Sequence, residues 1–226
     1  MDYSRLYAQE AKQYEELIGF EDAQGNLPRY LKTASKGLEY CLDCGTGTGR
    51  LARILAGLGK KVVGYDSSSS MLSRLPSELL PRSLVADHLN LPFAGPTFDL
   101  ITAGWTFCHL VDAQPHSWKT PLNLLFRHLF SILKTDGKII VVETLGTGTP
   151  IPNPPAHLIE YQNHLQQMGF QKDWIRTDYE FPDLKTARRL SAFFFSESME
   201  KNIDSGPPAQ LKECTGIWTC SKESLS

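Results

Sequence analysis

Apolar residues along the chain follow two patterns, short uninterrupted runs and repeats at intervals of three and four positions. The short runs at 38–42, 61–65, 83–86, 98–103 and 138–143 have the length of strands buried on both faces. Helical repeats stand between several of them, including apolar residues at 51, 54, 55 and 58 and a longer stripe over 121–133. Strands that alternate with helices are typical of a parallel sheet covered by helices, so the pattern predicts an α/β fold.

The two ends of the chain carry further predicted elements. In the C-terminal third, 170–181 and 216–221 predict strands, while 158–168 and 183–195 have helical spacing. Near the N-terminus, Ala11, Tyr14, Leu17 and Ile18 share one helical face of the segment 3–20 with Tyr7, which indicates a docking stripe. A short helix is expected at 30–34, and the main α/β domain is expected to start near residue 37.

A glycine-rich turn follows the first predicted strand. Gly45, Gly47 and Gly49 stand at alternate positions between this strand and the helix that begins near Leu51. Glycines let the backbone bend tightly and let a ligand lie against the peptide planes, where a side chain would collide. Free N–H groups at the start of the helix favour a carboxylate or another anion. The turn is therefore the main candidate for a ligand site, and a purely structural corner is the alternative.

The spacing of the turn distinguishes two classes of nucleotide-binding protein. The dinucleotide fingerprint G-x-G-x-x-G needs a third glycine where this chain has Arg50. The pattern Asp43-x-Gly45-x-Gly47-x-Gly49 instead resembles the first motif of the class I S-adenosylmethionine-dependent methyltransferases. The resemblance covers about 37–221 and implies a Rossmann-like, doubly wound sheet of seven strands, mostly parallel with an antiparallel last strand, and helices on both faces. It also implies S-adenosylmethionine as the cofactor, with S-adenosylhomocysteine as the product.

Side chains after the second and third strands extend the expected cofactor site. Asp66 ends the second strand about 20 residues past the turn, where a carboxylate can accept both ribose hydroxyl protons. The resemblance implies that Ser67 and Met71 lie beside the ribose and adenine, and that Asp87 accepts a hydrogen bond from the adenine amino group with His88 packed nearby. Helix capping by the serines and turn capping by Asp87 are the structural alternatives. The full expected set is Asp43, Gly45, Thr46, Gly47, Gly49, Asp66, Ser67, Met71, Asp87, His88, Gly104 and Trp105.

The methyl acceptor is expected at the ends of the first and fourth strands, where a parallel sheet has its topological switch point. Trp105 follows the fourth strand, and an aromatic face attracts a sulfonium cation. His109 is a candidate proton acceptor because imidazole titrates near neutral pH, and Glu143 is a second one at the end of the fifth strand. An acceptor atom without a proton would need neither group. Candidates for the pocket wall are Tyr14, His109, Trp118, Tyr161 and Arg176.

Two segments are candidates to cover the site. In methyltransferases that this chain resembles, an N-terminal helix often forms part of a lid. We therefore expect residues 1–36 to be an N-terminal helical lid segment, in which Tyr7 or Tyr14 closes over the cofactor, and residues 37–226 to be the S-adenosylmethionine-binding part of a single domain. The run Phe193-Phe194-Phe195 is a candidate hood over the acceptor, with plain core packing as the alternative.

Composition and charge limit the partners. The 226 residues are 41% hydrophobic, which suffices for one domain with a substantial core. The formal net charge is −2 and the basic residues are scattered, so we expect no nucleic acid and no membrane partner. The chain start has no export signal and no apolar run approaches the roughly 18–20 residues that span a bilayer, so a cytoplasmic protein is expected. Five cysteines without paired histidines indicate reduced thiols and no metal site, and the oligomeric state is expected to be a monomer or a homodimer.

Together these features predict a methyltransferase that acts on an O, N or S atom of a small molecule. Two alternatives belong to other classes, a non-catalytic S-adenosylmethionine-binding protein and a nucleotide-dependent oxidoreductase. Arg50 disfavours the oxidoreductase, because that class needs glycine at its position.

Overall fold

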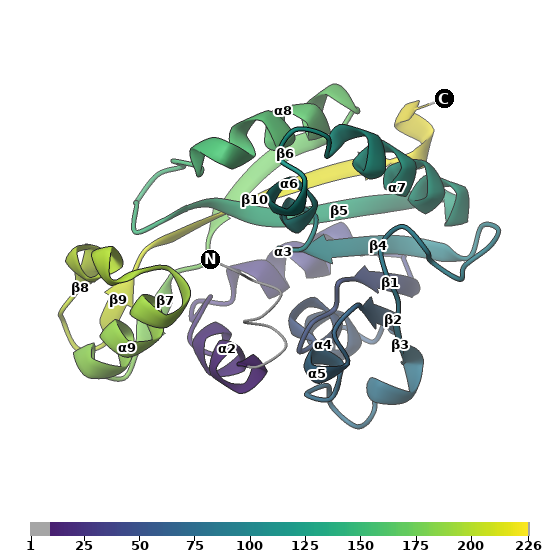
Figure 1. Ribbon diagram of the computed structural model, residues 1–226. Helices are drawn as coiled ribbons and strands as arrows, with labels where there is room; N and C mark the ends of the chain where they lie inside the picture. The colour runs from purple at the N-terminus through teal and green to yellow at the C-terminus, as the bar shows by residue number, and fades with distance from the viewer. Residues whose placement is uncertain (1–9, 226) are drawn as a thin grey trace.

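A seven-stranded mixed sheet forms the centre of the molecule (Figure 1). The computed structural model describes residues 10–225, and Tyr7 of the predicted lid lies outside them. The strand order is β3-β2-β1-β4-β5-β10-β6; the first five of these strands are parallel, and β10 is antiparallel to both of its neighbours. The strands are β1 (Tyr40–Cys44), β2 (Lys61–Asp66), β3 (Ser83–Val85), β4 (Phe98–Gly104), β5 (Leu133–Thr147), β6 (Gln171–Arg176) and β10 (Glu213–Ser221). The predicted sheet, with its antiparallel last strand, is confirmed.

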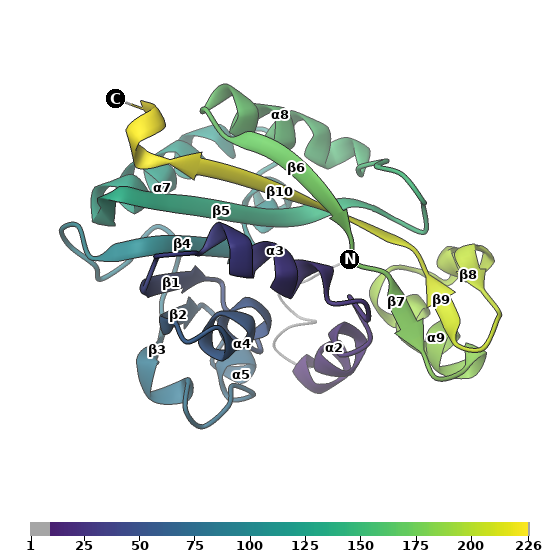
Figure 2. The same cartoon turned by 180° about the vertical axis from the view of Figure 1, so that it is seen from behind.

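Helices cover both faces of this sheet (Figures 1 and 2). Neighbouring strand residues point to opposite faces: Cys41 belongs to a core cluster with Leu55, whereas Leu42 belongs to a second cluster with Phe126. The first face carries α3 (Asn26–Ala34), α4 (Arg50–Gly57) and α5 (Ser69–Leu72), and the second carries α6 (Cys108–Ala113), α7 (Lys119–Ile132) and α8 (Ile159–Gln167). Short 3₁₀ turns lie at η1 (Leu80–Arg82), η2 (Ala156–Leu158), η3 (Glu197–Asn202) and η4 (Lys222–Leu225).

A second, three-stranded sheet lies beside the main one and was not expected from the sequence. Its order is β7-β9-β8, formed by β7 (Tyr179–Phe181), β9 (Ala209–Leu211) and β8 (Ile203–Asp204). The helix α9 (Leu184–Phe194), predicted at 183–195, packs on it, and Asp183 caps its start by accepting the Thr186 N–H at 2.7 Å. Leu17 and Phe181, both fully buried, belong to the apolar core of this unit.

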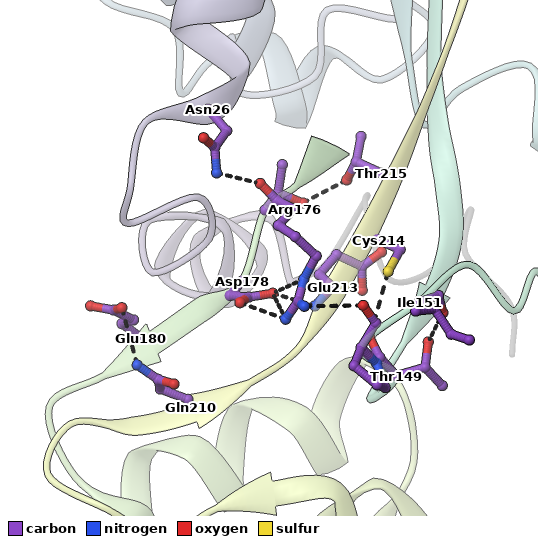
Figure 3. A network of polar contacts seen from close by, with 12 residues as sticks. Asn26, Thr149, Ile151, Arg176, Asp178, Glu180, Gln210, Glu213, Cys214 and Thr215 are labelled. Atoms are coloured by element: carbon purple, nitrogen blue, oxygen red, sulfur yellow. Dashed lines mark hydrogen bonds and ion pairs between the residues drawn. The ribbon is translucent and has the colours of Figure 1, made fainter. Parts of the chain in front are cut away.

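The predicted strand 170–181 is two strands in two different sheets, because polar contacts divide it (Figure 3). Arg176 pairs with Asp178 at 2.6 Å, and Asp178 accepts the N–H of Glu213 at 2.9 Å. The Asn26 amide donates to the Arg176 carbonyl at 2.8 Å, which ties the start of α3 to the end of β6. These bonds hold the chain where it leaves the main sheet for the small one.

The helix α2 (Ala11–Ile18) joins the small sheet to the glycine-turn half of the molecule (Figure 2). Its Tyr14 ring lies 5.6 Å from the ring of Phe194 in α9. On the other side, Glu15 forms ion pairs with Arg53 at 3.0 Å and Arg74 at 2.7 Å. The N-terminal segment therefore bridges two parts of the fold. Within residues 10–225, no helix combines the length and apolar character needed to cross a bilayer.

The small sheet is expected to unfold together with the main sheet, because α2 contacts both parts of the fold and the chain passes from β9 into β10 through one residue. Phe181→Ala empties a fully buried site and should lower the free energy of unfolding by about 3–5 kcal/mol in urea denaturation. Leu124→Ala, at a position 51% exposed on α7, should change it by less than about 1 kcal/mol. A separate early unfolding transition in Phe181→Ala would contradict one cooperative unit.

Candidate active site

The glycine turn adopts a backbone conformation that other residues avoid. Gly45, Gly47 and Gly49 have φ angles of +61°, +56° and +94°, in the left-handed region. A Cβ atom at Gly45 would also collide with the side chain of Thr106. Gly49 precedes the first residue of α4, so the N-terminus of that helix opens beside the turn.

Two carboxylates hold the turn against the ends of β1 and β2. Asp43 is buried and accepts hydrogen bonds from the Thr46 and Thr102 hydroxyls, both at 2.7 Å. Burial raises the pKa of Asp43 to about 6. Asp66 accepts the N–H of Gly47 at 2.9 Å and that of Ser68 at 2.8 Å; burial also raises its pKa, and these two bonds oppose the rise.

A cavity of about 770 Å³ lies beside this turn. Eleven of the twelve predicted cofactor residues line it, and the exception, Gly49, acts as the N-cap position of α4. The eleven are Asp43, Gly45, Thr46, Gly47, Asp66, Ser67, Met71, Asp87, His88, Gly104 and Trp105. The structure thus brings the separate sequence motifs together around one cavity.

His88 and Asp87 form the end of the cavity beyond β3. The His88 ring is hydrogen bonded to the Tyr65 hydroxyl at 2.8 Å and to the Thr106 hydroxyl at 3.1 Å. Burial lowers the pKa of His88 to about 4, so the ring is neutral at pH 7. One oxygen of Asp87 accepts the Leu89 N–H at 2.8 Å, the turn bond that the structural alternative expected.

A second, inner cavity of about 170 Å³ adjoins the first. Six residues line both cavities: Tyr14, Ile18, Arg50, Trp105, His109 and Asp112. The inner cavity extends from this shared wall to β5, β10 and the small sheet, and Phe194 and Phe195 lie on its wall. Its residues come from segments that are far apart in the sequence.

Two buried glutamates line the inner cavity. Glu143 accepts the Cys108 N–H and the Tyr161 hydroxyl, both at 3.1 Å on Oε1, and burial raises its pKa to about 7. Glu213 accepts the Thr144 hydroxyl at 2.8 Å on Oε1, and burial raises its pKa to about 8. The Oε2 atom of each carboxyl is buried without a hydrogen-bond partner among the described residues. Each of these Oε2 atoms is therefore able to form a hydrogen bond with a ligand.

Arg50 is a wall residue that sequence reasoning treated only as a missing glycine. Its guanidinium lies 3.9 Å from the centre of the Trp105 ring and pairs with Glu21 at 2.6 Å. Glu21 also accepts hydrogen bonds from the hydroxyl groups of Tyr179 at 2.8 Å and Thr177 at 3.1 Å. The signal available in the sequence was the position of Arg50 directly after the glycine motif; Glu21 and Glu213 had no comparable signal.

His109 lines both cavities, and its Nδ1 lies 3.6 Å from an oxygen of Asp112. It is therefore at the shared wall, as is Tyr14. Glu143 lies only on the inner cavity, so the two predicted proton acceptors occupy different positions.

Three predicted pocket residues do not line either cavity, and this expectation is corrected. Trp118 is 3% exposed and packs edge-on against the Tyr161 and His164 rings. Tyr161 is buried and reaches the site only through its bond to Glu143. Arg176 is held by Asp178 in the contacts that separate β6 from β7. Trp118 was expected in the pocket because it follows the fourth strand, and Tyr161 because it lies in the C-terminal half, but both rings turn into the core under α7 and α8.

Comparisons with known proteins agree with this geometry. Residues 42–141 match the family model described as a methyltransferase domain. The chain is 24% identical over 217 residues to a demethylmenaquinone methyltransferase of Lactobacillus johnsonii, covering 89% of this chain and 84% of the relative. It is 32% identical over 114 residues to a demethylmenaquinone methyltransferase of Thermotoga maritima, covering 49% of this chain and 46% of the relative.

Solved structures share the fold. A phosphoethanolamine N-methyltransferase 2 of Haemonchus contortus, solved with S-adenosylhomocysteine, has a TM-score of 0.59 at 16% identity, covering 97% of this chain and 59% of that one. The YcgJ protein of Bacillus subtilis has a TM-score of 0.54 at 15% identity, covering 86% of this chain and 97% of that one.

The matched segment contains the end of β1, the glycine turn, Asp66 and β4, which contribute to the wall of the large cavity. Residues 42–141 form a methyltransferase domain, and the fold and the large cavity are those of a class I S-adenosylmethionine-dependent methyltransferase. This assignment excludes the oxidoreductase alternative.

Removal of the Asp66 carboxylate should weaken cofactor binding. Loss of a charged hydrogen-bond acceptor costs about 1.5–3 kcal/mol, so Asp66→Ala should lower the affinity for S-adenosylmethionine and S-adenosylhomocysteine by roughly 10- to 100-fold in calorimetric titration. Asp136→Ala, at an exposed position of β5, is the matched control and should bind as the wild type does. Nicotinamide dinucleotides should not bind either protein; equal affinity of Asp66→Ala and wild type would contradict a role for this carboxylate.

The raised pKa of Glu143 predicts a pH-dependent cost in stability. The carboxyl ionises near pH 4.5 in the unfolded chain and near pH 7 when folded, so ionisation destabilises the fold as the pH rises through this interval. The free energy of unfolding of Glu143→Gln, relative to that of the wild type, should therefore increase as the pH rises from 5 to 8, by up to about 3 kcal/mol. One pKa unit is worth about 1.4 kcal/mol. Urea denaturation of both proteins at pH 5 and at pH 8 measures this difference in the free energy of unfolding. A constant difference would show that Glu143 titrates normally.

Proposed function

We propose that this enzyme transfers the methyl group of S-adenosylmethionine to an O, N or S atom of a small molecule bound in the inner cavity. The observation that carries this proposal is the wall that both cavities share, with Trp105 and His109 on it. Methyl transfer is an in-line displacement, so it needs a donor and an acceptor held at about 3–3.5 Å from each other. Two adjoining cavities supply that arrangement without a covalent intermediate.

The large cavity has the chemistry that the cofactor requires. The glycine turn leaves space where a Cβ atom would stand, and the Asp66 carboxylate suits ribose hydroxyls. Asp87 and the neutral His88 suit an adenine ring. Arg50 Nη2 is buried without a hydrogen-bond partner among the described residues, and it is a donor for a carboxylate. When bound, S-adenosylmethionine supplies a methyl group on a positively charged sulfur.

Two residues are candidates to accept a proton from the acceptor. His109 lines both cavities, whereas Glu143 lines only the inner cavity in which the acceptor is proposed to bind. The pKa of Glu143, raised to about 7, suits a group that takes a proton at neutral pH. Tyr14 and Ile18 of α2 line both cavities, which supports a lid role for the N-terminal segment.

The alternative is a protein that binds S-adenosylmethionine without catalysis. The inner cavity favours the enzyme, because a binding protein has no need of a second cavity with buried carboxyls beside the cofactor site. The reaction product separates the two functions.

Filling the inner cavity should stop turnover and spare cofactor binding. Thr147 lines only the inner cavity, so Thr147→Phe should lower the rate of acceptor-dependent S-adenosylhomocysteine formation by about 100-fold. Its affinity for S-adenosylmethionine should stay within about twofold of the wild type. The assay detects S-adenosylhomocysteine by mass spectrometry with small phenols, thiols and amines.

The control for this variant is Thr135→Phe, at an exposed position of the same strand, which should keep wild-type turnover. Full activity of Thr147→Phe would place the acceptor elsewhere. Absence of S-adenosylhomocysteine with every acceptor, in protein that binds the cofactor, would favour the non-catalytic alternative.

A further inference from the structure

We propose that Glu21 is a positioning residue, which holds Arg50 in place to bind the amino-acid carboxylate of S-adenosylmethionine. This inference rests on the proposed function in one respect, the placement of the cofactor in the large cavity. It depends on the burial of the ion pair that the two side chains form, on the bonds that hold Glu21 and on one unused donor atom of Arg50.

Arg50 is the only arginine or lysine on the walls of the two cavities, among the residues that the structure describes. The methyl group of S-adenosylmethionine must face the inner cavity, and the sulfur that carries it is joined to the amino-acid group. The amino-acid group therefore belongs near the shared wall, on which Arg50 lies. Arg50 also begins α4, and the N-terminus of a helix favours an anion. The carboxylate of the cofactor would thus meet this guanidinium.

The ion pair between Arg50 and Glu21 is buried. The two side chains are 15% and 3% exposed, which is less than in any other ion pair among residues 10–225. Burial lowers the pKa of Arg50, but the charge of Glu21 and the hydrogen bond to it raise this pKa, and the net shift is upward. Glu21 thus compensates the cost of placing a positive charge inside the wall.

One donor atom of this guanidinium is unused. Nη1 of Arg50 donates to Oε2 of Glu21 at 2.6 Å, whereas Nη2 is buried without a hydrogen-bond partner among the described residues. A guanidinium is planar and its N–H groups form a rigid fork, so the bond at Nη1 fixes the direction of Nη2. Native proteins rarely leave a buried donor unpaired, and arginine forms short, strong hydrogen bonds with carboxylates. A ligand carboxylate would satisfy Nη2.

Glu21 is itself held by the segment 177–179, which leads into the small sheet. Its Oε2 accepts a hydrogen bond from the Tyr179 hydroxyl at 2.8 Å, and its Oε1 accepts one from the Thr177 hydroxyl at 3.1 Å. The backbone of Glu21 forms a β-bridge with Tyr179, and the N–H of the next residue, Asp22, donates to the Thr177 carbonyl at 3.3 Å. The position of Arg50 is therefore set by a part of the fold that lies outside the glycine turn.

Trp105 holds the guanidinium of Arg50 from another side. The centre of its ring lies 3.9 Å from the guanidinium carbon, and its N–H donates to the Val142 carbonyl at 2.7 Å. The φ angle of Trp105 is +49°, in the left-handed region that a bulky residue rarely adopts. Such a conformation persists only where the surrounding structure holds it, and it is common at ligand sites. Arg50 is therefore fixed by a carboxylate and by a ring.

Other acids would compete for Arg50 if Glu21 were absent. Burial and the negative charge of Glu21 raise the pKa of Glu213 to about 8, so this carboxyl is mostly neutral at pH 7 and does not repel a ligand carboxylate. Without Glu21, Glu213 would ionise more readily. Asp66 and Asp112 also lie on cavity walls to which Arg50 belongs. A guanidinium released from Glu21 would pair with one of these carboxyls, and its free N–H groups would be lost to the cofactor.

A pair of ligands isolates the contact with the cofactor carboxylate. S-Adenosylhomocysteine and 5′-methylthioadenosine share the adenosine group and the sulfur, and only the first has the amino-acid group. Each ligand is titrated by calorimetry into the 226-residue chain, and the ratio of the two dissociation constants is measured. Wild-type protein should bind S-adenosylhomocysteine about tenfold or more tightly, because a hydrogen bond to a charged group changes affinity by roughly 10- to 100-fold. A smaller ratio would overturn the proposal.

Two substitutions test the two residues. Arg50→Gln and Glu21→Ala should each lower this ratio by about fivefold or more. The affinity for 5′-methylthioadenosine should stay within about twofold of the wild type, which also shows that the variant is folded. Adding Glu21→Ala to Arg50→Gln should lower the ratio no further, because Glu21 acts through Arg50. A ratio in Glu21→Ala that equals or exceeds the wild-type ratio would overturn the positioning role.

A milder variant decides the question if Glu21→Ala does not fold. Thr177 lines neither cavity, and Thr177→Val removes one of the two hydroxyl groups bonded to Glu21 with little change of shape. It should lower the ratio by about twofold or more, again without a change in the affinity for 5′-methylthioadenosine. An unchanged ratio in Thr177→Val would count against the positioning role.

The matched control is Glu15→Ala, in the same N-terminal segment. It removes the ion pairs with Arg53 at 3.0 Å and Arg74 at 2.7 Å and leaves the contacts of Arg50 in place. The ligand ratio should therefore equal that of the wild type. A fall as large as that in Glu21→Ala would show that any loosening of the segment has this effect, and it would overturn the specific role of Glu21.

The turnover assay distinguishes this inference from the proposed function. S-Adenosylhomocysteine formed with an acceptor, by a protein whose ligand ratio does not depend on Glu21, would overturn this inference alone. No S-adenosylhomocysteine with any acceptor, in a protein whose ratio falls as expected, would contradict the proposed function and support the role of Glu21 in cofactor binding.

Discussion

The structure depends on the hydrogen bonds that two carboxylates make to the glycine turn. Asp43 binds the Thr46 hydroxyl within the turn and Thr102 on β4, while Asp66 binds the Gly47 N–H from the end of β2. Three parallel strands are thereby joined at their C-terminal ends. The turn keeps left-handed φ angles that only glycine adopts without strain, and this leaves an open surface on which a ligand can lie.

The ion pair of Arg50 and Glu21 extends this arrangement beyond the cofactor site. Arg50 starts the helix that follows the turn, and Glu21 receives further bonds from Tyr179 of the small sheet and Thr177. The N-terminal segment, the turn and the small sheet thus meet at one buried contact. Arg50 lines both cavities and Glu21 lines the inner one, so the two cavities are built on shared residues, among them Trp105.

The buried acids have different consequences for stability and for function. Ionisation of Glu143 and Glu213 in an apolar setting destabilises the folded state, and their raised pKa values express this cost. A protein that keeps such groups gives up stability at the site where it binds. Burial raises the pKa of Asp43 as well, but two hydroxyl donors bond both oxygens of its carboxyl, and its role is to hold the turn.

The sequence by itself determined the main sheet and the cofactor wall. Strand runs, helical repeats and the alternate glycines are local signals. The motif from Asp43 to Asp66 is short, so these signals suffice to place its side chains. Only the tertiary structure decided the inner cavity, the second sheet and the positions of Trp118 and Arg176. Glu21 meets Thr177 across 156 residues, and no local pattern encodes which face of a strand or helix meets such a distant partner. Packing of whole elements makes that choice, and it is the reason that the acceptor site was hidden in the sequence.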